Sequence, residues 1–261
     1  MVLIGWPVVD AVWGFLRSPE FSAIGSIATL GGLWLAWKAI VDGKALSKNL
    51  RDVEKSLSTR RVGEAPDLAG VIAELVVKAK VSIQITAIFP VVAIYRNPQA
   101  WVALENALRE RQTHGVKVEL LYSSREQRWS AMQLQYADAF KDWAKWSANP
   151  VNAARLEAFT KRYECKHYPF QKAEQFLEFI LEVQADIVSH LYWTAPPKIT
   201  DDFVPVITWI IDGGTPEAEA FFAVTLSEGK TIGFVTRDQH LIGSFQSVRD
   251  LYSLAASPGS L

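Results

Sequence analysis

Two charged residues near the C-terminus stand where α/β proteins commonly bind ligands. Asp212 closes the apolar run 203–211, and Arg237 follows a second apolar run, 230–236. We interpret both runs as buried strands, and side chains at the carboxyl ends of such strands often line binding sites. We therefore expect Asp212 and Arg237 to bind a ligand, with the guanidinium contacting an anionic group. Because two glycines follow Asp212, a role in a turn is the alternative.

The other reactive side chains lack the spacing that metal binding or nucleophilic catalysis requires. Glu217 and Glu219 follow Asp212 and are potential metal ligands, but acidic residues at a helix start also simply stabilise the helix dipole. The four histidines and the single cysteine, Cys165, form no pattern of metal ligands or of a nucleophile with its base. We expect Cys165 to be a small buried residue. The sequence therefore predicts neither a metal ion nor a cofactor.

The composition argues against two further classes of protein. The formal net charge is −1 over 261 residues, whereas proteins that hold nucleic acid by bulk electrostatics need a clustered basic surface. We expect no sequence-specific nucleic-acid binding. A single cysteine forms no intrachain disulfide, which fits a reducing compartment and not a secreted disulfide-rich protein.

An uncharged apolar segment near the N-terminus has the length of a membrane-spanning helix. Residues 21–37 carry no charge, and residues 39–41 extend the apolar run to about 20 residues, enough to cross the hydrocarbon core. We expect a transmembrane helix over 21–41; the alternative is a buried core helix. Only one basic residue, Arg17, precedes this span, whereas seven basic residues lie from Lys38, near the end of the span, to Arg61. The positive-inside rule then predicts a single-pass protein of the bacterial inner membrane with a cytoplasmic C-terminal domain.

The segments on either side of the predicted span, 1–20 and 42–61, are also informative. Residues 2–16 are apolar but short, so we expect an interfacial segment, with a second crossing as the alternative. Residues 42–61 predict an amphipathic helix, either a coiled-coil seam or a helix lying on the globular domain. Small residues on one face of the span let two helices approach closely. Together these patterns predict a homo-oligomer, formed through Gly25, Thr29, Gly32, Ala36, Leu46, Leu50, Val53 and Leu57.

Residues 67–257 alternate helical and strand patterns, which predicts one α/β domain with a mostly parallel or mixed sheet and inserted helices. Residues 62–67 have the composition of a linker. Asn97, followed by proline, and Asp238 are typical helix caps. We expect strands at 81–88, 116–122, 165–170, 203–211 and 230–236. We expect helices at 68–79, 98–115, 125–163 with a break at Asn149, 172–193, 215–226 and from 239 onward.

Three segments, 70–90, 103–123 and 204–252, together resemble a phospholipase D-like domain in their order of helices and strands. The resemblance lies in this pattern and not in a motif. Active members of that superfamily carry His-x-Lys-x-x-x-x-Asp, in which histidine attacks phosphorus and lysine neutralises the phosphate oxygens. If Asp212 holds the aspartate place, Pro205 and Ile207 stand where histidine and lysine would be. Neither side chain can perform that chemistry.

The resemblance therefore implies a degenerate domain without the family's catalytic motif. We expect a membrane-anchored, non-catalytic sensor, scaffold or effector component, whose partners are the lipid bilayer and a cytoplasmic protein or small ligand. Small membrane-anchored bacterial proteins of this kind resemble components of stress and phage-defence systems, an analogy at the level of fold. Two alternatives remain open. One is a membrane-bound hydrolase or nuclease with a rearranged site, and the other is a membrane-perturbing effector.

Overall fold

The computed structural model describes residues 59–64, 68–91, 93–191, 195–202, 204, 206–225 and 231–258. The predicted interfacial segment, the transmembrane helix and the predicted oligomerisation residues all lie outside this part of the chain. Among the helices that the structure does describe, none combines the length and the apolar character needed to cross a membrane.

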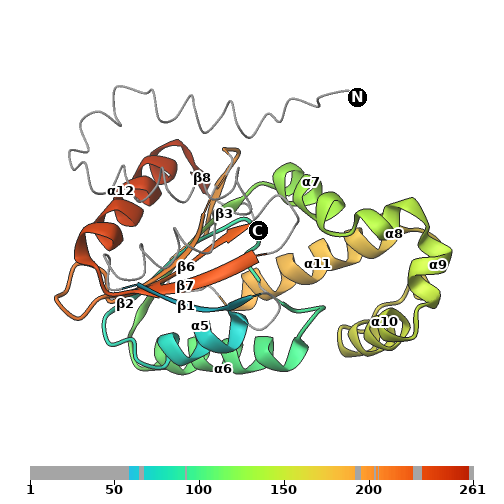
Figure 1. Cartoon of the computed structure of the whole chain (residues 1–261), viewed down its shortest axis with the longest axis horizontal. Coiled ribbons are helices and arrows are strands. Elements are labelled where there is room, and N and C mark those ends of the chain that lie inside the picture. Colours follow the sequence, from blue (N-terminus) through green and yellow to red (C-terminus); the bar gives the residue numbers. More distant parts are fainter. Residues whose placement is uncertain are drawn as a thin grey trace.

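A mixed sheet of eight strands forms the centre of the domain, in the order β1-β7-β6-β5-β2-β3-β4-β8 (Figure 1). β2, β3 and β4 run parallel to one another, and all other neighbouring strands are antiparallel. The strands are β1 (Thr59–Glu64), β2 (Ser82–Ala87), β3 (Lys117–Ser123), β4 (Lys198–Thr200), β5 (Ile207–Ile211), β6 (Glu219–Thr225), β7 (Thr231–Thr236) and β8 (Ser257–Pro258). The predicted mixed α/β sheet is thus confirmed.

The described helices are divided unequally between the two faces of the sheet (Figure 1). They are α5 (Leu68–Val76), α6 (Pro98–Thr113), α7 (Arg125–Gln135), α8 (Ala137–Lys141), α9 (Trp143–Ala148), α10 (Pro150–Arg162), α11 (Ala173–Leu191) and α12 (Gln239–Ala255). Helices α5, α6 and α11 contribute to the larger hydrophobic cluster on one face, whereas α12 contributes to a separate cluster on the other. Asn97 and Asp238 accept capping hydrogen bonds at the starts of α6 and α12, as predicted.

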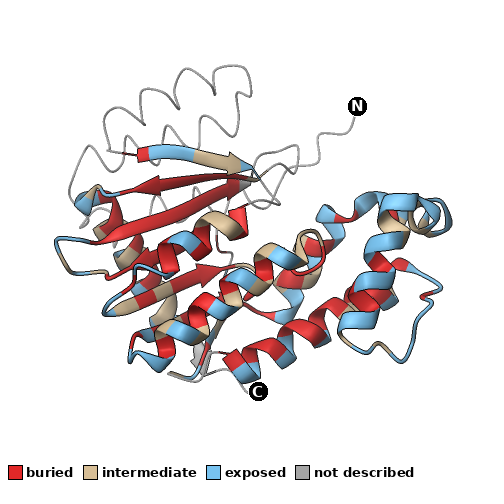
Figure 2. Cartoon of the chain, turned by 90° about the horizontal axis from the view of Figure 1, so that it is seen from below, coloured by how far each residue is buried: buried red, intermediate tan, exposed pale blue. Residues whose placement is uncertain are grey.

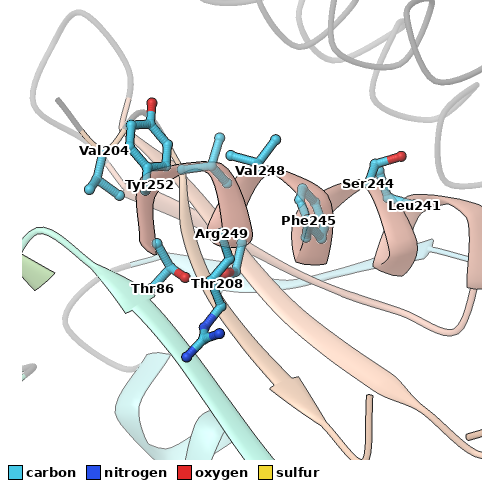
Figure 3. Close-up of a pocket in the computed structure, with 10 residues that line it drawn as sticks. Thr86, Val204, Thr208, Leu241, Ser244, Phe245, Val248, Arg249 and Tyr252 are labelled. Atoms are coloured by element: carbon cyan, nitrogen blue, oxygen red, sulfur yellow. The ribbon is translucent and has the colours of Figure 1, made fainter. Parts of the chain in front are cut away.

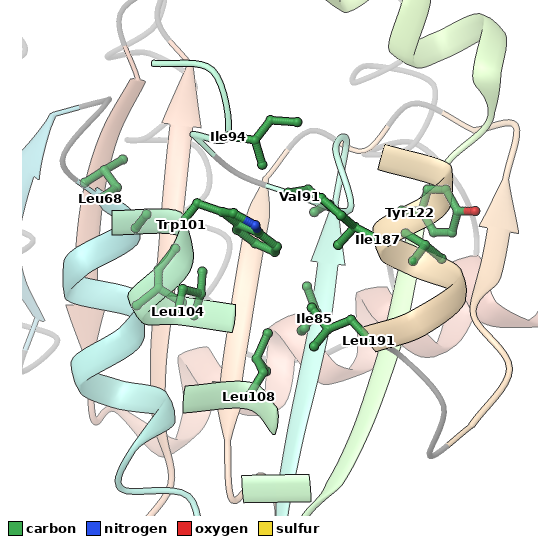
Figure 4. Packing of buried hydrophobic residues seen from close by; sticks show 14 of the residues in the cluster. Leu68, Ile85, Val91, Ile94, Trp101, Leu104, Leu108, Tyr122, Ile187 and Leu191 are labelled. Carbon is green, nitrogen blue, oxygen red and sulfur yellow. The ribbon is translucent and has the colours of Figure 1, made fainter. Parts of the chain in front are cut away.

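Strand β5 shows how the two clusters arise from one apolar run. Side chains alternate across a strand, so Trp209 and Ile211 enter the larger cluster and Ile210 enters the smaller one. In the larger cluster, Trp101 and Leu104 of α6 face the sheet (Figure 4). Buried residues follow the strands and the inner sides of the helices (Figure 2). A central strand buried on both faces explains why its sequence is almost continuously apolar.

The chain between β3 and β4 is an insertion of five helices, α7 to α11. Helices α8, α9 and α10 lie away from the sheet (Figure 1). The predicted break at Asn149 is confirmed, since its side chain caps α10, and further breaks occur at Tyr136 and Asp142. Trp143 and Trp146 stack on each other at 5.4 Å between ring centroids and pack against the larger cluster. These rings hold the insertion to α11, so their role is packing.

Four predictions of local structure are wrong. Residues 59–61 do not continue the predicted helix 42–61, and 62–64 are not a linker, because β1 adds an antiparallel edge strand beside β7. Residues 219–225 form β6 and not a helix. Their side chains alternate between the two clusters, with Phe222 on the α12 face and Phe221 on the other. This alternation, and not a helical period, decided the local structure.

The fourth wrong prediction is the strand at 165–170, since these residues form turns. Cys165 is half-buried and not fully buried, and the peptide bond before Pro169 is cis. Two short strands, β4 and β8, were not predicted. Segments of three and two residues are too short to show an alternating pattern in sequence.

Candidate functional site

Asp212 lies at the carboxyl end of β5, as expected, but its carboxylate faces the protein backbone. The residue is 6% exposed and has a positive φ of 52°. Its oxygens accept hydrogen bonds from the N–H groups of Lys80 (3.0 and 2.9 Å), Val81 (2.7 Å) and Ser82 (3.0 Å). Aspartate tolerates this left-handed conformation better than most residues. Asp212 therefore anchors the start of β2, and ligand binding by its carboxylate stays a prediction.

Arg237 lies at the same edge of the sheet, at the end of β7, and its guanidinium pairs with Glu219. The Glu219 side chain is 11% exposed and is also 3.4 Å from Nζ of Lys78. Glu217 is exposed and accepts a hydrogen bond from Nζ of Lys80 at 2.9 Å. That hydrogen bond and the charge of Glu217 raise the pKa of Lys80. The two acids are thus engaged with cations, and Arg237 and Asp212 have separate partners.

Asp212, Glu217 and Glu219 are not grouped into a metal site in the described part of the chain. No group of three or more histidine, cysteine, aspartate or glutamate side chains there is placed to hold a metal ion. His114 ends α6, whereas His167, His190 and His240 are exposed on other elements. The histidines are therefore dispersed over the molecule.

The place that the resemblance assigns to the catalytic lysine is part of the hydrophobic packing. Ile207 starts β5 and packs against the larger cluster on the same face as Trp209. Pro205, the residue in the histidine place, lies outside the described residues. The structure therefore shows that Ile207 is a packing residue, and its place in the family's motif stays a prediction from the resemblance.

A third location was not predicted from the sequence. The parallel strands β3 and β4 end side by side, where the Ser124 N–H donates to the Thr200 carbonyl at 2.8 Å. Buried polar residues gather at this edge: Ser123, Ser124, Arg128, Gln184 and Thr200. The carboxyl edge of parallel strands is the usual place for a site in α/β proteins. We define these five residues as the carboxyl-edge cluster.

Arg128 is the central charge of the carboxyl-edge cluster. The residue is 7% exposed, and its Nη1 donates to Oε1 of Gln184 on α11 at 3.1 Å. Its Cζ lies 5.2 Å from the centroid of the Tyr122 ring, a cation–π contact. Its Nε is buried and has no hydrogen-bond partner, and no carboxylate among the described residues forms an ion pair with it. Burial lowers the pKa of Arg128, but arginine keeps its charge in proteins.

The start of α7 adds to the positive potential of the carboxyl-edge cluster. Ser124 is the N-cap residue, yet its side chain makes no capping hydrogen bond. The first N–H groups of a helix lack partners inside the helix and carry the positive end of its dipole. Arg128 lies in the second turn, and helical side chains incline toward the N-terminus. A buried guanidinium and a helix start thus combine at one place, an arrangement suited to an oxyanion.

Comparisons with known proteins assign no family. No family model matches the sequence, and no curated protein matches it. Solved structures with a similar fold include three that we describe in turn. TrmBL2, an archaeal chromatin protein described with a novel mode of DNA binding, has a TM-score of 0.40 and 13% identity, covering 88% of this chain and 69% of that chain.

Two further solved structures are a phospholipase D family member, Nuc, and a phosphatidylserine synthase. Nuc from Salmonella typhimurium has a TM-score of 0.38 and 12% identity over 79% of this chain and 100% of that chain. Phosphatidylserine synthase from Haemophilus influenzae Rd KW20 has a TM-score of 0.40 and 14% identity over 77% of this chain and 38% of that chain. At these values the similarities assign neither a family nor an activity.

Proposed function

We propose that the chain is a membrane-anchored, non-catalytic sensor whose phospholipase D-like domain binds a small oxyanion at the carboxyl-edge cluster. The proposal rests on one observation: Arg128 is buried and has no acidic partner among the described residues. Burying a charge costs several kcal/mol unless it is paired. A carboxylate or phosphate bound at Nε would supply a charge-assisted hydrogen bond. The bound ligand would then offset the cost of burying Arg128.

Two further features support the non-catalytic part of the proposal. The three segments that resemble the phospholipase D-like domain fold as α5–β2, α6–β3 and β5–β6–β7–α12. Within this arrangement, Ile207 takes the lysine place and packs in the core. Membrane attachment rests on the predicted span 21–41 alone. An anchored cytoplasmic domain would place the oxyanion site close to the inner membrane.

The test uses the full-length protein in detergent, with inorganic phosphate as the probe. We expect phosphate to raise the melting temperature of the wild type and of Arg125→Met, but not of Arg128→Met. Arg125 is the matched control because it is a neighbouring arginine whose side chain is 54% exposed and paired with Glu178. If phosphate fails to raise the melting temperature of either variant, its effect on the wild type depends on overall positive charge and not on Arg128. No effect on the wild type, with acetate also inactive, would reject the oxyanion site.

A separate assay addresses catalysis. We expect no hydrolysis of bis-p-nitrophenyl phosphate or of DNA, with or without divalent metal ions, above the background of the detergent buffer. Hydrolysis that disappears in His167→Ala, or on addition of a metal chelator, would favour the hydrolase with a rearranged site. The arginine variants and this assay test independent parts of the proposal.

A further inference from the structure

One flank of α12 borders an apolar groove (Figure 3). The groove has a volume of about 50 Å³ and lies between α12 and the segment that leads into β5. Its apolar lining on the helix side follows one stripe of α12, spaced 4-3-4: Leu241, Phe245, Val248 and Tyr252. Across from this stripe lie Val204 and Val206. Such spacing is the contact seam that one helix presents to another.

This face of the sheet is wider than α12 can cover. Eight strands at a spacing of about 4.8 Å span about 34 Å, whereas one helix covers about 10 Å. Among the described helices, α12 alone contributes to the hydrophobic cluster on this face. The same cluster contains apolar side chains of the outer strands β6 and β7, including Phe222 and Phe234. An additional apolar element is therefore needed beside α12.

We propose that residues 42–57 of the same chain form a helix that packs along α12 in this groove. The segment carries its own 4-3-4 stripe: Leu46, Leu50, Val53 and Leu57. Each stripe extends over 12 residues, so its two ends lie about 17 Å apart along the helix. The two stripes therefore match in length and in spacing.

The place where the chain enters the described structure sets the direction of this packing. Thr59 starts β1, and its hydroxyl donates to Oγ1 of Thr236 at 2.9 Å, two residues before the cap of α12 at Asp238. The segment therefore ends beside the N-terminus of α12 and runs antiparallel to that helix. This direction pairs Leu57 with Leu241 at one end of the groove.

Disulfide cross-linking of the full-length protein in detergent tests the proposal, with Cys165→Ser as the background. We expect Leu57→Cys with Leu241→Cys to form an intrachain disulfide in most molecules. Leu46→Cys with Leu241→Cys is the matched control, because the two positions lie about 17 Å apart in the proposed packing, and it should remain reduced. Equal cross-linking of both pairs would contradict the proposed direction.

A second possible result of the cross-linking would show that the stripe 46–57 packs against another copy of the chain. If Leu57→Cys alone forms a covalent dimer, and the double variant forms no intrachain bond, the stripe is a coiled-coil seam between two chains. The proposal would then be rejected.

Hydrogen exchange provides a check that does not depend on oxidation. In Leu50→Asp, amides of 239–255 should exchange about tenfold faster than in the wild type, because local opening becomes easier. The exposed-face variant Ser47→Asp should leave exchange unchanged. Equal exchange in all three proteins would reject the proposed packing.

Discussion

Ser82 and Asp212 exchange two hydrogen bonds between the start of β2 and the end of β5. The Asp212 N–H donates to the Ser82 carbonyl at 2.8 Å, and the Ser82 N–H donates to Oδ1 of Asp212 at 3.0 Å. The two residues are 130 positions apart. The same carboxylate accepts the N–H groups of Lys80 and Val81. Asp212 thus joins two adjacent strands in the middle of the sheet.

Replacing Asp212 by alanine should reduce the free energy of unfolding by about 3 kcal/mol, because three backbone N–H groups lose their acceptor in a buried place. Urea denaturation followed by circular dichroism measures this loss. Glu217→Ala is the control and should stay within about 0.5 kcal/mol of the wild type, since that side chain is exposed. A ligand-binding aspartate without a structural role would instead leave stability unchanged in both variants.

Arg128→Met should leave the ligand-free protein as stable as the wild type or raise its free energy of unfolding by about 1 kcal/mol or more. The reason is that methionine of similar length removes a buried charge that lacks an acidic partner among the described residues. Denaturation in phosphate-free buffer measures the change. A loss above about 2 kcal/mol would show that Gln184 and Tyr122 already satisfy the guanidinium.

Two glycines should respond in opposite ways to alanine. A Cβ on Gly233 would lie 2.5 Å from Cδ2 of Leu68 and 2.7 Å from Cε2 of Phe221, so overpacking should cost about 1–3 kcal/mol. A Cβ on Gly243 of α12 meets nothing within 4 Å, so alanine should stabilise that helix by up to about 1 kcal/mol. Thermal denaturation of both variants checks the pair. A stabilised Gly233→Ala protein would contradict the packing of β7 against α5.

Stability at alkaline pH should depend on Tyr252. Burial, together with the nearby charge of Asp202, raises the pKa of Tyr252 to about 12. In the unfolded chain tyrosine ionises at about 10, so the unfolded state loses its proton first as the pH rises. The stability that Tyr252 contributes is therefore present below pH about 10 and is lost as the pH rises through about 12.

Tyr252→Phe tests this dependence directly. Its free energy of unfolding should fall less steeply between pH about 10 and about 12 than that of the wild type. The control is Tyr168→Phe, at an exposed tyrosine that is 42% accessible, and it should follow the wild-type curve. Identical slopes for all three proteins would show that Tyr252 ionises equally in both states.

Local signals in the sequence determined most of the helices and the central strands. Asn97 and Asp238 mark helix starts within a few residues of the backbone groups that they cap. The apolar run before Asp212 marks β5, because a strand buried on both faces favours apolar side chains at nearly every position. These features depend on neighbours along the chain, so a single sequence is enough to predict them.

Only the tertiary structure decided the parts that depend on distant residues. Residues 59–64 form a strand because they pair with the edge of β7. Asp212 has a structural role because its carboxylate accepts backbone hydrogen bonds from the start of β2. Arg128 looks like an ordinary helical arginine in the sequence, and its burial follows from α7 packing between β3 and α11. The sequence specifies each residue's chemistry and local conformation. Burial, strand pairing and the partner of each charge arise when segments far apart in the chain come together.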